Sequence, residues 1–113
     1  MKIFIFAVLI VLCVPIFDAW GFVGNDLIKQ LREYEKVERN DPKTIDISAG
    51  FYIGYVRGIY ESNTNIICAG ENVKLGQMTA IVAKYLNEHP EEWNQPANML
   101  VIKALIKEFP CKQ

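Results

Sequence analysis

The sequence predicts an all-α protein, a small bundle of four to five helices with one disulfide. Apolar residues recur at helical spacing in four segments, and polar stretches or prolines separate these segments. No segment shows the apolar and polar alternation that is typical of a half-buried strand. Because the chain has only 113 residues, every element must contribute to a single core.

Residues 1–19 have the layout of a secretory signal peptide. Lys2 precedes an apolar run over residues 3–17, and Ala19 is a suitable last residue of a leader. A retained membrane anchor is the alternative, but about 15 apolar residues fall short of the roughly 20 that a spanning helix needs. A lipid anchor on Cys13 is disfavoured, because a leucine precedes this cysteine where lipid-attachment signals have Gly, Ala or Ser. We therefore expect cleavage after Ala19 and no membrane attachment afterwards.

The remaining domain, residues 20–113, carries little net charge. Removing residues 1–19 removes one lysine and one aspartate, so 11 basic and 12 acidic side chains remain and the formal net charge stays at −1. This balance gives no charge-driven case for binding nucleic acid or an anionic membrane surface.

No motif of a catalytic or cofactor site occurs in the sequence. The patterns of nucleotide-binding loops, serine hydrolases, zinc proteases and EF-hands are all missing. His89 is the only histidine, and no nucleophile or acid is nominated as its partner, so we expect it to have a structural role at a helix end. We expect a binding protein without a cofactor rather than an enzyme.

Two cysteines, Cys68 and Cys111, remain after the leader is removed. An exported chain reaches a compartment in which disulfides persist, so we expect these two to pair. In the chain-entropy model, a bridge that closes about 43 residues contributes roughly 4 kcal/mol to stability. A zinc site is the alternative, but His89 is the only conceivable third ligand and no Cys-x-x-Cys spacing occurs.

The first helix of the domain is expected over residues 25–39, where Leu27, Leu31 and Tyr34 form one apolar stripe. Asp41 and Pro42 are well suited to the cap and first turn of a second helix. We expect that second helix to continue to about residue 62.

Three glycines, Gly50, Gly54 and Gly58, share one face of this second helix. Each costs roughly 1 kcal/mol relative to alanine in a helix interior. Because apolar residues surround the helix, we expect it to be buried, with the glycines allowing close approach of another helix in the bundle or at the seam of a dimer. Membrane helix pairs also use this spacing, but charges such as Arg57 and Glu61 leave an uncharged run of only about ten residues.

The third helix is expected over about residues 75–88, ended by His89 and Pro90. A short turn or a single helical turn should follow. Pro96 can then take the first position of a fourth helix, which Pro110 ends. The residues expected to face the core from these two helices are Leu75, Met78, Val82, Tyr85, Leu86, Ala97, Leu100, Val101, Ala104, Leu105 and Phe109.

The second half of the chain resembles the Rap/Tai family of type VI secretion immunity proteins. The resemblance is carried by "YVRGIYE" at 55–61, Cys68, "LGQMTAIVAKYLNEHPEEWNQPANMLVIKAL" at 75–105 and "FPC" at 109–111. Two positions depart from the family pattern: Tyr52 stands where many members have a cysteine, and Lys74 stands where a threonine caps the third helix.

The matching positions look like scaffold rather than contact residues, because most are apolar, glycine or proline. Carried over one by one, they are Tyr55, Gly58, Tyr85, Leu86, His89, Pro90, Pro96, Ala97, Ala104, Leu105, Phe109 and Pro110, together with the two cysteines.

The resemblance implies a small periplasmic all-helical protein, often a homodimer, that binds and blocks a peptidoglycan amidase delivered by type VI secretion. Such an inhibitor would act stoichiometrically, by covering the amidase cleft. The alternative from another class is a periplasmic acid-stress chaperone, a holdase that exposes apolar surface on acidification. An orphan binding protein with a different partner is a further alternative.

Contact residues cannot be inherited from the family, because immunity proteins discriminate among toxins through variable surface positions. Binding residues usually lie on polar loops of a rigid scaffold. We therefore expect recognition by the loop after the second helix and by the turn after the third. The candidate residues are Asn63, Thr64, Asn65, Glu71, Asn72, Glu91, Glu92, Trp93 and Asn94.

Overall fold

The computed structural model of the chain describes residues 21–112, so the predicted signal peptide lies outside the described residues. Four α-helices and one short 3-10 helix occur in this range. Their bounds are α2 (Gly24–Glu38), α3 (Asp46–Ser62), α4 (Leu75–Glu88), η2 (Pro90–Glu92) and α5 (Ala97–Glu108). The prediction of a small all-α bundle is confirmed.

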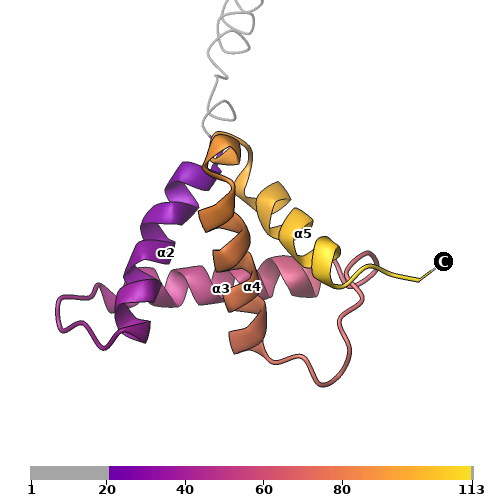
Figure 1. Cartoon of the computed structure of the whole chain (residues 1–113), viewed down its shortest axis with the longest axis horizontal. Coiled ribbons are helices and arrows are strands. Elements are labelled where there is room, and N and C mark those ends of the chain that lie inside the picture. Colours follow the sequence, from indigo (N-terminus) through magenta and orange to yellow (C-terminus); the bar gives the residue numbers. More distant parts are fainter. Residues whose placement is uncertain (1–20, 113) are drawn as a thin grey trace, which may run out of the picture.

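Three of the helices converge at one end, and α3 crosses them at the other end (Figure 1). Figure 1 shows α2, α4 and α5 close together at the end where η2 lies and spreading apart toward α3, which runs across them. The core lies among the four α-helices. It consists of Leu27, Ile28, Leu31, Tyr34, Ala49, Tyr52, Val56, Ile67, Met78, Val82, Leu86, Ala97, Leu100, Val101, Ala104 and Leu105.

Two helix starts differ from the sequence prediction. α3 begins at Asp46, because Asp41 accepts a hydrogen bond from the Lys43 amide (2.8 Å) and so stabilises a turn instead of capping a helix. The amide of Ile45, the residue before α3, donates to a carboxylate oxygen of Glu33 on α2 (2.9 Å). Likewise, Pro96 precedes α5 with an extended ψ of 132° instead of occupying its first helical position.

A buried polar contact joins α2, α3 and α4 in the core. The Tyr52 hydroxyl donates to the carbonyl oxygen of Thr79 (2.5 Å), and the hydroxyls of Tyr34 and Thr79 lie 3.2 Å apart. Tyr52 is fully buried and Thr79 nearly so. Because the phenol is removed from water, the pKa of Tyr52 is raised far above its ordinary value.

The glycines of α3 do not pack against another helix of the chain. A Cβ added at Gly50, Gly54 or Gly58 would meet nothing within 4 Å, so the predicted close approach within the bundle is wrong. The physical reason is the orientation of α3, which buries Ala49, Tyr52 and Val56 and turns the glycines to the outside.

The outer face of α3 is also partly apolar. Ile47 is 87% exposed and Phe51 is 46% exposed, beside the open glycines. The expectation that α3 is buried on all sides is therefore wrong. A close contact of this face with a second copy of the chain remains a prediction.

The glycine that does allow close packing is Gly24, the first residue of α2. A Cβ at this position would lie 2.6 Å from Cδ1 of Leu100 and 2.8 Å from both Cα and the carbonyl oxygen of Trp93. Real Cβ atoms do not approach backbone atoms so closely. The start of α2 therefore packs directly on the backbone of the segment between α4 and α5.

Candidate functional site

The connection between α4 and α5, residues 89–96, is called here the α4–α5 turn. Its backbone is bound to the start of α2: the amide of Gly24 donates to the carbonyl of Gln95 (2.9 Å), and the amide of Asn25 donates to the carbonyl of Trp93 (2.7 Å). The first amides of a helix have no partner within the helix, so the carbonyls of the turn satisfy them. The turn is thus joined to a helix that is distant in sequence.

Side chains from α4 and α5 also bind the turn. Glu92 accepts one hydrogen bond from the Tyr85 hydroxyl (2.7 Å) and another from the Lys103 ammonium (2.9 Å). Lys103 also donates to the side-chain oxygen of Gln95 (2.8 Å). The two donors stabilise the carboxylate and lower the pKa of Glu92, whereas burial and the bond to Glu92 raise the pKa of Tyr85 to about 12.

Trp93 packs into the turn instead of pointing away from it. Its indole N–H donates to the carbonyl of Leu86 (2.8 Å), and the guanidinium of Arg32 lies 5.8 Å from the ring centroid. Of the four candidate contact residues in this turn, Glu92 and Trp93 are therefore partly buried and bonded within the chain. Glu91 and Asn94 are exposed, so they are the pair that a partner can reach most readily.

His89 is bonded within the chain at the end of α4. Its ring lies stacked on Tyr85, with centroids 4.1 Å apart, and Nδ1 lies 2.8 Å from the Tyr85 carbonyl oxygen. Because a carbonyl can only accept, Nδ1 carries the proton of this bond. The side chain could form a cation site with Glu91 and Glu92, since their ligand atoms lie within 4.8 Å. However, both oxygens of Glu92 already accept hydrogen bonds, so we assign no metal there.

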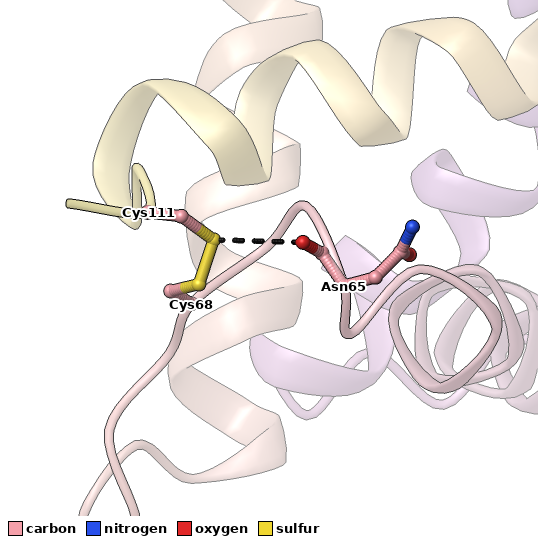
Figure 2. The surroundings of a disulfide bond; sticks show 3 residues. All are labelled: Asn65, Cys68 and Cys111. Atoms are coloured by element: carbon pink, nitrogen blue, oxygen red, sulfur yellow. Dashed lines mark hydrogen bonds between the residues drawn. A yellow bond between two sulfur atoms is a disulfide. The ribbon is translucent and has the colours of Figure 1, made fainter. Parts of the chain in front are cut away.

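The second candidate loop, Asn63–Asn72, is joined to the end of the chain. The structure pairs Cys68 with Cys111 in a disulfide, as predicted. The Cys68 amide also donates to the carbonyl of Phe109 (2.9 Å). Figure 2 shows the bridge with Asn65 beside it, and Sγ of Cys111 lies 3.9 Å from the Asn65 carbonyl oxygen.

Most candidate contact residues of this loop are accessible. Thr64, Asn65, Glu71 and Asn72 are exposed, whereas Asn63 is half-buried and its side-chain Nδ2 donates to the Ile59 carbonyl (2.7 Å). Asn63 therefore helps to end α3.

The structure does not bring the two candidate surfaces together. The loop leads into the start of α4, and the α4–α5 turn follows its end, so the 14 residues of α4 separate them. At about 1.5 Å per residue, this separation is roughly 20 Å. A partner that contacts both surfaces must therefore extend along α4.

The positions that matched the family pattern occupy three kinds of environment. Leu86, Ala97, Ala104 and Leu105 are buried; Tyr55, Tyr85, His89 and Phe109 are half-buried; Gly58, Pro90, Pro96 and Pro110 are exposed. The half-buried Tyr55 contacts Phe22, with ring centroids 5.1 Å apart.

Comparison with known families identifies the chain. The family model of the Rap1a immunity proteins matches residues 23–111, which include all five helices of the described residues and both cysteines of the disulfide. The chain belongs to this family. No curated protein matches it. Membership of the Rap1a family indicates an immunity protein that acts against a secreted effector, and therefore a protein partner.

Rap1a membership also bears on catalysis, because immunity protein families are generally non-enzymatic. None of the helices within residues 21–112 is long and apolar enough to cross a membrane.

Proposed function

We propose that this Rap1a protein acts in the periplasm, where it binds a peptidoglycan amidase delivered by type VI secretion and blocks the amidase cleft. The observation that carries the proposal is the family match over residues 23–111, together with the signal-peptide pattern of residues 1–19. The inhibitor would protect the producing cell against its own toxin and that of its siblings.

The α4–α5 turn is the better of the two candidate surfaces for entering a cleft. It lies at the end where α2, α4 and α5 converge (Figure 1), and its backbone is bound to α2. A rigid turn loses little conformational freedom on binding, so more of the contact energy remains as affinity. Glu91 and Asn94 would then contact the amidase, with Glu92 and Trp93 supporting them from inside.

The loop Asn63–Asn72 would make a second contact, on the amidase surface beside the cleft. Its exposed polar side chains suit a hydrogen-bonded rim, and the disulfide limits the movement of the loop. With a formal net charge of −1, shape and local hydrogen bonds would determine the affinity more than long-range attraction.

We also propose that the free protein is a homodimer and that the outer face of α3 is its seam. The support is the combination of three open glycines with the exposed side chains of Ile47 and Phe51. A two-fold axis at Gly54 would place Gly50 against the partner's Gly58, so that two helix backbones could approach closely.

The proposed function is tested by co-purification. The chain is expressed with its leader in the periplasm together with type VI amidase candidates of its own genome, and the mass of the product is determined by light scattering. A stable complex without peptidoglycan cleavage supports the proposal. Absence of a complex with every amidase candidate refutes the amidase target and leaves another secreted effector as the partner.

A further inference from the structure

Lys103 on α5 binds two side chains of the α4–α5 turn. Its ammonium donates to Glu92 Oε1 (2.9 Å) and to Gln95 Oε1 (2.8 Å), so one cation joins two residues on either side of Trp93 and Asn94. The side chain of Lys103 is 43% exposed and that of Glu92 is 17% exposed. The contact therefore lies at the surface, beside the part of the turn that a partner would reach.

A partly exposed ion pair of this kind contributes little to overall stability. Exposed pairs typically contribute about 0 to 1 kcal/mol. The core of the domain is formed by other residues, and Lys103 contacts none of the buried polar groups of α3 and α4. Its two bonds can nevertheless restrict the turn, because they fix both residues that flank the tip.

The backbone of the turn depends on the same two residues. The Gln95 amide donates to the Glu92 carbonyl (2.9 Å), which closes the tip of the turn around Trp93 and Asn94. The Lys103 ammonium binds the side chains of this same pair. Side-chain and backbone bonds thus act on one small loop, in which Asn94 is exposed.

We infer that Lys103 is a positioning residue for partner recognition: it orders the α4–α5 turn so that Glu91 and Asn94 are presented in one conformation. This inference rests on the proposed function, because it takes the α4–α5 turn as the contact surface. Lys103 acts through Glu92 and Gln95. Loss of its two bonds should leave the fold intact but require the turn to be ordered during binding, which lowers affinity.

Tyr85 is less suitable for this role. Its hydroxyl reaches only one oxygen of Glu92, and its ring is half-buried and stacked on His89. Substitution of Tyr85 would therefore disturb packing as well as the turn. Substitution of Lys103 changes the bonds to the turn without changing the packing of the Tyr85 ring.

The test compares Lys103→Met and Lys103→Arg with Lys107→Met in the full mature domain. Methionine keeps most of the aliphatic stem and removes the donors, whereas arginine restores two donors to the two oxygens. Lys107 is the matched control, since it is an exposed lysine one turn further along α5 and makes no side-chain hydrogen bond or ion pair within residues 21–112.

Two readouts are needed. Hydrogen exchange of the Gln95 amide, followed by NMR in the free protein, reports the order of the turn without any partner. Binding to the cognate effector, measured by calorimetry, reports recognition. For Lys103→Met we expect several-fold faster exchange at Gln95, unchanged thermal unfolding and affinity reduced about fivefold to tenfold. Lys103→Arg should restore both quantities, and Lys107→Met should change neither.

Unchanged Gln95 exchange in Lys103→Met would overturn the inference, because the lysine would then not order the turn. Faster exchange with unchanged affinity would overturn it too, because an ordered turn would then not be needed for recognition. Failure of the proposed function gives a different result: wild-type protein would bind no effector, while the exchange measurement would still show whether Lys103 orders the turn.

Discussion

Gly24 on α2 lies directly against the backbone of Trp93 in the α4–α5 turn. A Cβ on residue 24 would come within 2.8 Å of Trp93 Cα, and the Gly24 amide donates to the Gln95 carbonyl at 2.9 Å. The start of one helix thus positions the turn that we propose as the contact surface.

Gly24→Ala should therefore destabilise the domain. The added methyl group meets backbone atoms that no side-chain rotation can move, and overpacking of this kind typically costs about 1 to 3 kcal/mol. Urea unfolding of the two proteins measures the difference. The control is Gly76→Ala, which adds the same methyl group at an open position of α4, outside the proposed dimer seam, and should be neutral or stabilising by up to about 1 kcal/mol. Equal stability of Gly24→Ala and wild type would show that the close contact at residue 24 does not contribute to the stability of the domain.

Tyr52→Phe should also lower the free energy of unfolding. The substitution leaves the buried carbonyl of Thr79 without the hydroxyl that now donates to it at 2.5 Å, which costs about 1 to 3 kcal/mol. Tyr60→Phe serves as the control, because Tyr60 is only half-buried. Urea midpoints that are the same for the two variants would argue against a stabilising contact between Tyr52 and Thr79.

Replacement of both cysteines by serine removes the bridge between Cys68 and Cys111, which lie 43 residues apart. In the chain-entropy model, the expected loss of stability is roughly 4 kcal/mol, and reduction of the wild-type protein should cause a similar loss. Chemical unfolding with and without reductant measures both. A loss below about 1 kcal/mol would mean that the unfolded chain gains little freedom without the bridge.

Acidification should loosen the α4–α5 turn through Glu92. The pKa of Glu92 is lowered in the folded protein by its bonds to Tyr85 and Lys103. A lowered carboxyl pKa stabilises the fold above the unfolded value of 4.5, and this contribution is lost as the pH falls below 4.5 toward the folded value. Gln95 amide exchange, corrected for its intrinsic pH dependence, should therefore show loss of protection in this range.

Glu92→Gln is the control for this pH effect. Because an amide does not titrate, the Gln95 amide of this variant should show no loss of protection in this pH range. A loss of protection that persists in Glu92→Gln would assign the pH effect to another titrating group. Binding of an apolar dye on acidification, while the helices remain folded, would instead favour the holdase alternative.

Gly54→Leu tests the proposed dimer seam. The position is open in the single chain, so the larger side chain should leave the fold intact, while a closely packed α3 pair would be separated. Sedimentation should show a dimer for wild type and a monomer for Gly54→Leu. A wild-type monomer, or a dimer that the substitution leaves intact, would refute this seam.

The helices were predictable because their signals are local. The apolar periodicity of residues 75–88 marked α4 correctly. For the segment after it, the sequence predicted a short turn or a single helical turn, and η2 is the single helical turn. The predicted start of α3 was wrong. Asp41 is a residue type that often caps helices, but here it accepts a hydrogen bond from the Lys43 amide in a tight turn. Composition alone does not separate these two uses.

The contacts of Gly24 were not predictable in this way. Its close neighbour, Trp93, lies far along the chain, and a glycine at the first position of a helix gives no periodic signal. The outward glycines of α3 could have been recognised from Ala49, Tyr52 and Val56, whose spacing defines a core stripe on the opposite side. Glu92 and Lys103 lie 11 residues apart in the sequence, and their side chains meet only in the folded chain. Their roles could therefore not be predicted.

Inhibition is measured most directly by titrating the cognate amidase with the mature domain while peptidoglycan hydrolysis is followed. We predict that hydrolysis falls to zero at a fixed stoichiometry, and that replacing Glu91 and Asn94 by alanine weakens this inhibition without changing thermal unfolding. Full hydrolysis in the presence of excess domain, for every amidase candidate of the genome, would show that the domain does not inhibit these amidases.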